Sequence, residues 1–577
     1  MITVTIPIGS THILPDSVPI TRGVFGYNYT GFRSFDRFDS QLSDSLVGLI
    51  SWPGGSLAEN LPERYDLRYP DLWNGDVDFG LDQLFTKAKQ YNAGVSLVLP
   101  TARYLGREDV MRADLHGFLG RVLDGSLGPI PERLILEIGN EYYSTFGTGA
   151  AHATDYGRLA NDMVQTLSAV LSDPVQNPAG VDVEIAVQVG RAPAEDVAIR
   201  AELSAESLRN VDMLIYHRFA PYATGIDRSY GTLVEHVDDW QAAMEAAGGT
   251  RPEVFMSSYN VASYTRAEAL RDYVEAEAAL GITVDPDSID MDGRTDTGFE
   301  KFWQNALTNR HYGIEQTRVL LELQAHIGSV GLGAASVYGV DLQHPARLSL
   351  TAQDGQGYDF VGQDALDLLA ESTLGTRVLD TSIRNDQKHD TLWTYGFEND
   401  DKLVTFVTWH NMPPGALQVK VAGLSTGAYK AVWAETLHAE VPADWMTRFG
   451  IPDNPDVDET PESQSFALGV REHIPVTQLD DAVQVTMDRP HEILRLVFAK
   501  TDAGMAEIAG WEDQDPLLLQ PPADDGTGLP PVDMGTPPAE EDPDTPDPSA
   551  MDDGGAGAEL GGMLGALLLV AVLAMAL

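Results

Sequence analysis

The chain has no cysteine and few basic residues for its 577 positions. Without cysteine it has no disulfide, no thiolate metal site and no thiol nucleophile. It has 37 Lys and Arg residues against 87 Asp and Glu residues, so the formal net charge is −50. Such an acidic surface repels nucleic acid and anionic lipid headgroups. It also disfavours polyanionic substrates, unless basic residues cluster at one place. The chain is 43% hydrophobic and long enough for two or more domains, each with its own core.

The C-terminal part of the chain has no basic residue, because no Lys or Arg follows Lys500. Residues 511–559 are rich in Pro, Asp and Gly, and such a composition predicts a disordered acidic linker. Residues 560–577 are uncharged and apolar over about the minimum length of a membrane span. We interpret them as a transmembrane anchor. The alternatives are an export or sorting signal and a low-complexity tail that never inserts.

The two ends of the chain give little information about the route to a membrane. Residues 1–7 alternate like a strand and lack the basic and apolar regions of a secretory signal. No basic residue flanks the C-terminal run, so charge does not set its orientation. The sequence therefore predicts a protein that is membrane-anchored or exported to the cell surface by a route not visible at its start.

The middle of the chain alternates strand-like and helix-like stretches. Eight apolar runs lie at 24–30, 46–52, 95–100, 134–139, 183–189, 211–216, 254–257 and 334–340, with helix-like stretches between them such as 156–171 and 302–327. This number of βα units predicts a (β/α)8 TIM barrel over residues 15–374. An open doubly wound sheet is the alternative, and it is disfavoured because no Gly-rich phosphate loop follows the first run. In a barrel, the carboxyl ends of the strands build the active site.

The pattern changes near Gly375, where short alternating strands replace the βα units. The strand-like runs are 378–383, 391–397, 403–409, 417–421, 429–434, 483–487 and 493–498. Short strands separated by turn residues predict a β-sandwich over residues 375–500. We expect residues 1–14 to add a strand to it and so to join the two domains.

Five segments of the barrel resemble motifs of clan A glycoside hydrolases that join a (β/α)8 barrel to a β-sandwich, as in families 39, 51 and 79. They are Phe25-Gly26-Tyr27-Asn28, Trp52-Pro53-Gly54-Gly55-Ser56, Ile138-Gly139-Asn140-Glu141, Tyr216-His217 and Ser258-Tyr259-Asn260-Val261. The resemblance covers roughly residues 15–500, and it rests on the order, spacing and strand-end position of the five segments. The resemblance implies glycosidase activity with Glu141 as the acid/base.

Two positions depart from the motifs of the family. The nucleophile of the family falls on Ser258, and the Arg that usually precedes Trp-Pro-Gly-Gly falls on Ser51. The resemblance implies that this Arg would lie under the nucleophile and keep it ionised. A retaining glycosidase needs two carboxylates about 5–5.5 Å apart. We therefore expect Glu141 and Ser258 to face each other at a degenerate catalytic site, with their side-chain oxygens about 5–6 Å apart.

The residues that we expect to contact a sugar lie at strand ends or just after them. They are Asn28, Glu59, Asn140, Tyr142, Tyr216, His217, Tyr259, Asn260 and Tyr338. Aromatic rings at a barrel mouth stack on sugars, and polar groups hold hydroxyls. Glu141 and several of these residues have a plainer alternative role. Glu141 could cap a helix, Glu59 could be a solvated loop residue, His217 could be a buried histidine and the tyrosines could be core residues.

The acidic run 285–293 resembles a calcium loop without matching one. A Gly at loop position six leaves Phe299 where the pattern needs Glu, so we interpret the run as an ordinary solvated loop. No metal and no cofactor is predicted.

Three classes of function remain open at this stage. One is a glycosidase-like protein that binds an oligo- or polysaccharide with weak or no hydrolysis. Another is an active glycosidase with a relocated second carboxylate from Glu59, Glu300 or Asp341. The third is a non-catalytic structural or adhesive surface protein.

Overall fold

The computed structural model describes most of the first 519 residues. The described ranges are 2–8, 11–30, 46–60, 65–68, 80–228, 230–264, 266–289, 298–308, 312–340, 346–351, 357–382, 392–409, 417–424, 428–449, 466–489, 491–511 and 516–519. No helix within these ranges is both long and apolar enough to cross a membrane. The run 560–577 and nearly all of the expected linker 511–559 lie outside the described residues.

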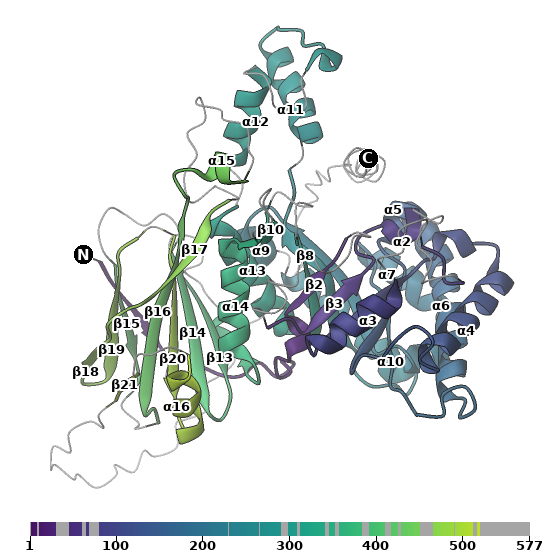
Figure 1. The fold of residues 1–577 in the computed structure, drawn as a ribbon, viewed down its shortest axis with the longest axis horizontal. Coiled ribbons are helices and arrows are strands. Elements are labelled where there is room, and N and C mark those ends of the chain that lie inside the picture. The colour runs from purple at the N-terminus through teal and green to yellow at the C-terminus, as the bar shows by residue number, and fades with distance from the viewer. Residues whose placement is uncertain are drawn as a thin grey trace, which may run out of the picture. The chain divides into compact units, whose positions relative to one another are not determined.

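Eight parallel strands close into a barrel, as the sequence predicts (Figure 1). They are β2 (Gly26–Asn28), β3 (Leu49–Trp52), β4 (Gly94–Leu99), β5 (Leu134–Ile138), β6 (Glu184–Gln188), β7 (Met213–Ala220), β8 (Glu253–Val261) and β9 (Leu332–Tyr338). Closure is completed where β2 pairs with β9. Each strand overlaps one of the eight apolar runs, because a strand buried on both faces is apolar nearly throughout.

Helices follow the barrel strands. The longer ones are α3 (Leu81–Gln90), α4 (Glu108–Leu123), α6 (Ala150–Ser172), α7 (Pro193–Glu202), α10 (Tyr230–Ala246), α11 (Arg266–Ala279), α12 (Gly298–Thr308), α13 (Ile314–Gly328) and α14 (Val361–Thr373). The helix-like stretch 302–327 is two helices, α12 and α13, rather than one. Gly313, with φ 61°, precedes α13 in a conformation that helical residues do not adopt.

Two sheets follow the barrel and pack as a sandwich. One has the order β12 (Arg377–Val378), β13 (Leu392–Glu398), β14 (Lys402–Trp409), β20 (Ile493–Ala499), β16 (Ala431–Glu440) and β17 (Leu468–His473), with β21 (Leu517–Leu518) beside β16. The other has the order β1 (Ile2–Pro7), β15 (Leu417–Ala422), β19 (Ala482–Met487) and β18 (Thr477–Leu479). Side chains of both sheets, such as Val419 and Leu496, share one apolar core.

The N-terminal strand belongs to the sandwich, because β1 pairs in parallel with β15. The chain therefore starts in the second domain and then enters the barrel. The strand expected at 378–383 is shorter than predicted: β12 ends at Val378, and residues 380–382 form a 3-10 helix.

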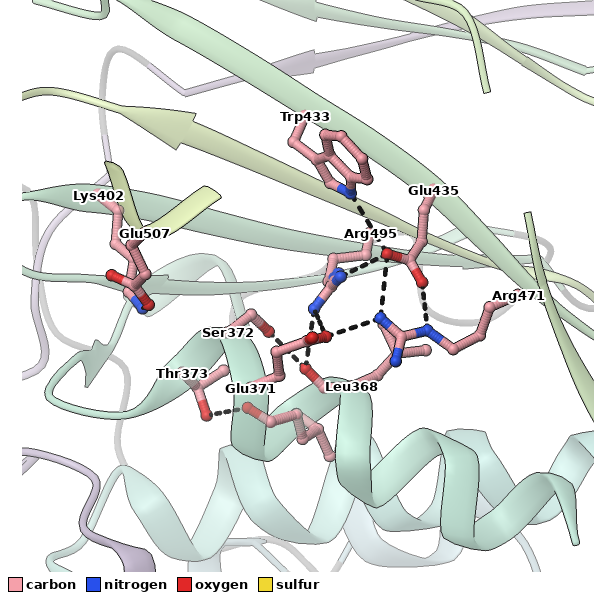
Figure 2. A network of polar contacts seen from close by, with 11 residues as sticks. Leu368, Glu371, Ser372, Thr373, Lys402, Trp433, Glu435, Arg471, Arg495 and Glu507 are labelled. Carbon is pink, nitrogen blue, oxygen red and sulfur yellow. Dashed lines mark hydrogen bonds and ion pairs between the residues drawn. The ribbon is translucent and has the colours of Figure 1, made fainter. Parts of the chain in front are cut away.

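A buried ion network joins helix α14 to the larger sheet (Figure 2). Arg495 of β20 binds Glu371 of α14 at 2.8 Å and also binds Glu435 of β16. Arg471 of β17 contacts the same two carboxylates, at 2.7 and 2.5 Å. Burial on its own would raise the pKa of Glu435, but Arg495 and Arg471 outweigh it and lower that pKa. The network therefore keeps Glu435 ionised where the helix meets the sheet.

Candidate functional site

The motif residues gather at the carboxyl ends of the barrel strands. Strand β5 ends at Ile138 and is followed by Gly139, Asn140 and Glu141. His217 lies in the C-terminal half of β7, and Ser258 lies in the same half of β8, where the two residues are partners in register. Register partners on neighbouring strands are roughly 4.8 Å apart. The Gly-Asn-Glu, Tyr-His and Ser-Tyr-Asn-Val segments thus meet at one end of the barrel.

Glu141 has a backbone conformation that is rare for its residue type. Its φ is 46° and its ψ is 63°, in the left-handed region. Among the described non-glycine residues, only Asn92 and His491 share a positive φ. Such a conformation costs about 1–3 kcal/mol and is concentrated at functional sites. The turn from β5 into the short helix α5 (Tyr142–Thr145) is therefore held in place by its surroundings.

The carboxylate of Glu141 is bound by three neighbouring side chains. Nδ1 of His217 lies 3.3 Å from Oε1, and the Ser144 hydroxyl donates to Oε2 at 3.2 Å. The Tyr143 hydroxyl donates as well. Burial raises the pKa of Glu141, but the hydrogen bond and charge of His217, with Tyr143 and Ser144, outweigh burial and lower that pKa. Glu141 is therefore ionised at neutral pH, with 28% of its side chain exposed.

Ser258, which the motif resemblance aligns with the nucleophile, is buried, with an exposed fraction of 4%. Strand β8 has a bulge at this point, where Ser257 and Ser258 together oppose the single residue Ser336 of β9. A hydroxyl without an adjacent base is a poor nucleophile toward a sugar. The distance expected between Glu141 and Ser258 stays a prediction.

Ser51, at the position of the family Arg, contacts a carboxyl group that the sequence interpretation missed. Ser51 and Ser96 each donate to Oε1 of Glu137 at 2.6 Å. Ser257 also hydrogen-bonds Glu137. Glu137 is 1% exposed. Burial raises its pKa, and the hydroxyls of Ser51 and Ser96, the charge of His217 and the hydroxyl of Ser257 oppose this only in part.

Glu137 belongs to a polar layer inside the barrel. An inner apolar cluster includes Leu49, Ile135, Ala186, Ile215, Phe255 and Ala334. Side chains two positions apart in a strand share a face. The residues two positions further on are Ser51, Glu137, Gln188, His217, Ser257 and Ser336. The signal for Glu137 was thus present in the sequence, as a charged residue on the inward face of a strand that is otherwise apolar.

Asn28 and Asn140 lie near the mouth of the barrel. Asn28 Nδ2 donates to the carbonyl of Ser257 at 2.8 Å, so it links β2 to β8. A Cβ on Gly54 would lie 1.9 Å from Asn28 Oδ1, which explains the first glycine of the Trp-Pro-Gly-Gly motif. Asn140 Nδ2 donates to Ser56 Oγ at 3.4 Å. Both amides therefore help to shape the strand ends.

Glu59 is neither solvated nor free. It is 7% exposed, and its oxygens accept hydrogen bonds from the backbone N–H and hydroxyl of Thr101 and from Ala102 N–H, at 2.6–2.9 Å. Burial raises its pKa, against these hydrogen bonds. In this arrangement Glu59 anchors the segment that follows β4.

Two of the four tyrosine candidates, Tyr142 and Tyr259, are bound by residues of the surrounding helices. Tyr142 donates to Glu195 at 2.7 Å and stacks on Tyr156, and Tyr259 accepts from Gln324 of α13 at 2.9 Å. Both are fully buried between barrel and helices.

Asn260 is also fully buried, and it donates to the carbonyls of Tyr338 and Ala346. Tyr216 and Tyr338 are half-buried. Tyr338 hydrogen-bonds Thr30 and lies edge-on to Phe219. Tyr216 and Tyr338 are therefore the two aromatic candidates with exposed surface.

Of the other two carboxylates considered as a second catalytic group, the structure describes only Glu300. Glu300 of α12 is held by Arg266 of α11 through two hydrogen bonds, of 2.6 and 2.8 Å. These two helices are neighbours (Figure 1). They pack on each other through a cluster that includes Phe299. Asp341 lies outside the described residues. In the acidic run, Asp285 caps a short 3-10 helix, and residues 290–293 lie outside the described part.

Comparison with known proteins gives the fold. No protein-family model matches the chain, and no curated protein matches it either. Two solved structures are similar over 86% of this chain and 99% of their own length. They are a GH51 arabinofuranosidase from Xanthomonas axonopodis pv. citri (TM-score 0.53, 11% identity) and a family 51 α-L-arabinofuranosidase from Bifidobacterium longum (TM-score 0.55, 12% identity). The chain has the fold of clan A glycoside hydrolases.

Proposed function

We propose that this protein binds carbohydrate, an oligo- or polysaccharide, at the strand ends around Glu141, with weak or no hydrolysis. The observation that supports the proposal is that Ser258, which the motifs align with the nucleophile, is the register partner of His217, and His217 contacts Glu141 at 3.3 Å. Retention requires a carboxylate nucleophile, and inversion requires a carboxylate that activates water. Neither role is open to the Ser258 hydroxyl.

The ionisation of Glu141 supports the same conclusion. A glycosidase acid must carry a proton when the leaving group departs, and a second carboxylate nearby raises its pKa for that purpose. Here His217 acts in the opposite direction and lowers the pKa of Glu141. At neutral pH, Glu141 is therefore an acceptor of hydrogen bonds from sugar hydroxyls rather than a proton donor. Asn140, Tyr216 and Tyr338 provide further polar and aromatic surface at the same strand ends.

Binding to a panel of immobilised oligosaccharides, followed by calorimetry on the hits, tests the proposal. Glu141→Gln should weaken binding about tenfold or more, because hydrogen bonds to a charged group contribute about 1.5–3 kcal/mol. Glu206→Gln is the matched control, since Glu206 is an exposed carboxylate on helix α8 (Ala205–Arg209). Absence of binding to every glycan would favour a structural or adhesive surface protein instead.

Turnover of activated aryl glycosides separates binding from catalysis. The wild type should show very low turnover. Robust turnover that Glu141→Gln abolishes and Ser258→Ala leaves intact would overturn the proposal in favour of an active glycosidase with a relocated carboxylate.

A further inference from the structure

Glu141, His217, Ser257 and Glu137 form a continuous chain of hydrogen bonds with a carboxyl group at each end. Nδ1 of His217 lies 3.3 Å from Glu141, and Nε2 lies 2.7 Å from Ser257 Oγ. Ser257 in turn hydrogen-bonds Glu137. The exposed fraction falls from 28% for the Glu141 side chain to 8% for that of His217 and 1% for Glu137. The chain thus runs from the strand ends into the barrel.

The order serine, histidine, glutamate is also that of a nucleophile with its base and its orienting acid. Burial excludes this role. Ser257 is 1% exposed and hydrogen-bonds Glu137, whereas Glu141 is the accessible end. A substrate therefore meets the carboxylate first and does not reach the hydroxyl.

Two arrangements of the protons satisfy every hydrogen bond of the chain with a neutral imidazole. In one, protonated Glu137 donates to Ser257, Ser257 donates to Nε2 of His217, and Nδ1–H donates to ionised Glu141. In the other, protonated Glu141 donates to Nδ1, Nε2–H donates to Ser257, and Ser257 donates to ionised Glu137. Exchange between them moves one proton across each link and leaves the net charge unchanged.

We propose that Glu137 and Glu141 share one exchangeable proton through Ser257 and His217, with Glu137 as the buried store. Glu141 is the end of this relay at the sugar-binding surface, so outward transfer changes it from an acceptor of hydrogen bonds to a donor; this clause rests on the proposed function. Transfer outward converts the Glu137 carboxyl to a carboxylate and the Glu141 carboxylate to a carboxyl group. Ser51 and Ser96, whose hydroxyls lie 2.6 Å from Glu137, bind the charge that is left inside.

The surroundings of Glu137 favour its protonated form. The groups that face it are the hydroxyls of β3, β4 and β8 already named and His217 on β7. The phenols of Tyr65 and Tyr156 lie within electrostatic range. Among the described residues, no Arg or Lys pairs with Glu137, in keeping with serine at the position of the family Arg. Burial raises the pKa of Glu137, whereas the hydrogen bond from His217 lowers the pKa of Glu141, so the proton rests on Glu137.

Infrared titration of the full chain tests the relay without any ligand. The band of the protonated Glu137 carboxyl is assigned as the difference between the wild type and Glu137→Gln, or from the band shift in Glu137→Asp if the amide variant does not fold. Glu141→Gln should lower the midpoint of this band by about one pH unit, as expected for strongly coupled sites. In a Ser257→Ala background, which breaks the relay and keeps both carboxyl positions, Glu141→Gln should leave the midpoint unchanged.

The outcomes separate the relay from the sugar-binding proposal. Equal shifts with and without Ser257 would mean coupling through space and would overturn the relay, as would no shift in either background. Glu492, a buried carboxyl of the sandwich whose pKa is raised to about 7, is the control. Its infrared band is assigned from its loss in Glu492→Gln, and the midpoint of that band should not change in Ser257→Ala. Loss of glycan binding with coupling intact would refute the proposed function alone.

Discussion

Nδ1 of His217 lies 3.3 Å from Oε1 of Glu141, so the carboxylate that the motifs predict as the acid/base is paired with an imidazole. In a retaining glycosidase the neighbour would be a second carboxylate. The two neighbours have opposite effects, because a carboxylate raises the pKa of Glu141 and an imidazole that donates a hydrogen bond lowers it. We therefore propose that serine at position 258 and the altered ionisation of Glu141 belong together.

Replacing His217 by Phe should raise the pKa of Glu141 above its ordinary value. The ring volume stays, burial continues to raise the pKa, and the largest opposing effect is gone. Titration of isotope-labelled glutamate by NMR measures the change.

Stability should respond to the same substitution. A lowered pKa stabilises the fold above the unfolded pKa, and this contribution is lost as pH falls through the folded value. In His217→Phe that loss on acidification should disappear. An unchanged Glu141 titration would contradict the assigned role of the ring.

Restoring the expected nucleophile should restore little activity by itself. Ser258→Glu places a carboxylate beside Glu141 without an Arg to keep it ionised, so turnover of aryl glycosides should rise only slightly. Ser258→Glu combined with Ser51→Arg should gain more, even though Glu137 competes for the new guanidinium. Glu141→Gln in the double variant is the control and should remove the gain, since acid/base catalysis contributes about 10²–10⁴-fold.

Truncating Arg495 should destabilise the protein, toward the lower end of about 3–5 kcal/mol, because it leaves the buried Glu435 with Arg471 as its remaining basic partner. Arg495→Ala tests this by urea unfolding. Arg495→Met, which keeps volume, should destabilise almost as much, because Glu435 remains. The control is Lys430→Ala, which removes the exposed pair with Asp502 and should leave the unfolding midpoint unchanged. Equal effects of Arg495→Ala and Lys430→Ala would contradict this role of the network.

Glu492 should make the protein less stable at high pH. Its folded pKa is raised by burial to about 7, so the folded state binds a proton that the unfolded chain releases. The stability gained from this proton is complete below the unfolded pKa and is lost as pH rises through about 7. Glu492→Gln should flatten the pH dependence of the melting temperature between about pH 5 and pH 8. An unchanged slope would show that the group stays ionised.

The C-terminal run is predicted to bind membranes. Full-length protein should sediment with lipid vesicles, and a chain ending at Asp553 should stay in solution, because residues 560–577 are uncharged and apolar. Matched sedimentation of the two proteins would remove the anchor interpretation and leave a sorting signal or an inert tail.

Much of the fold was determined by the sequence itself. Eight apolar runs with helices between them predict the barrel, because strands covered on both faces must be apolar. The change to period-two alternation after Gly375 predicts the sandwich for the same kind of local reason. Glu141 at the end of its strand was also readable, since strand ends follow from local pattern.

The partners of these residues were decided only by the tertiary structure. Tyr142 and Tyr259 follow or end strands as sugar-stacking residues would, yet they are buried against Glu195 and Gln324. The bulge that places Ser257 and Ser258 opposite Ser336 has no sequence signal that we recognise. Residues of β3, β5, β7 and β8 meet around Glu137 because the barrel closes, and closure brings together positions that are far apart along the chain.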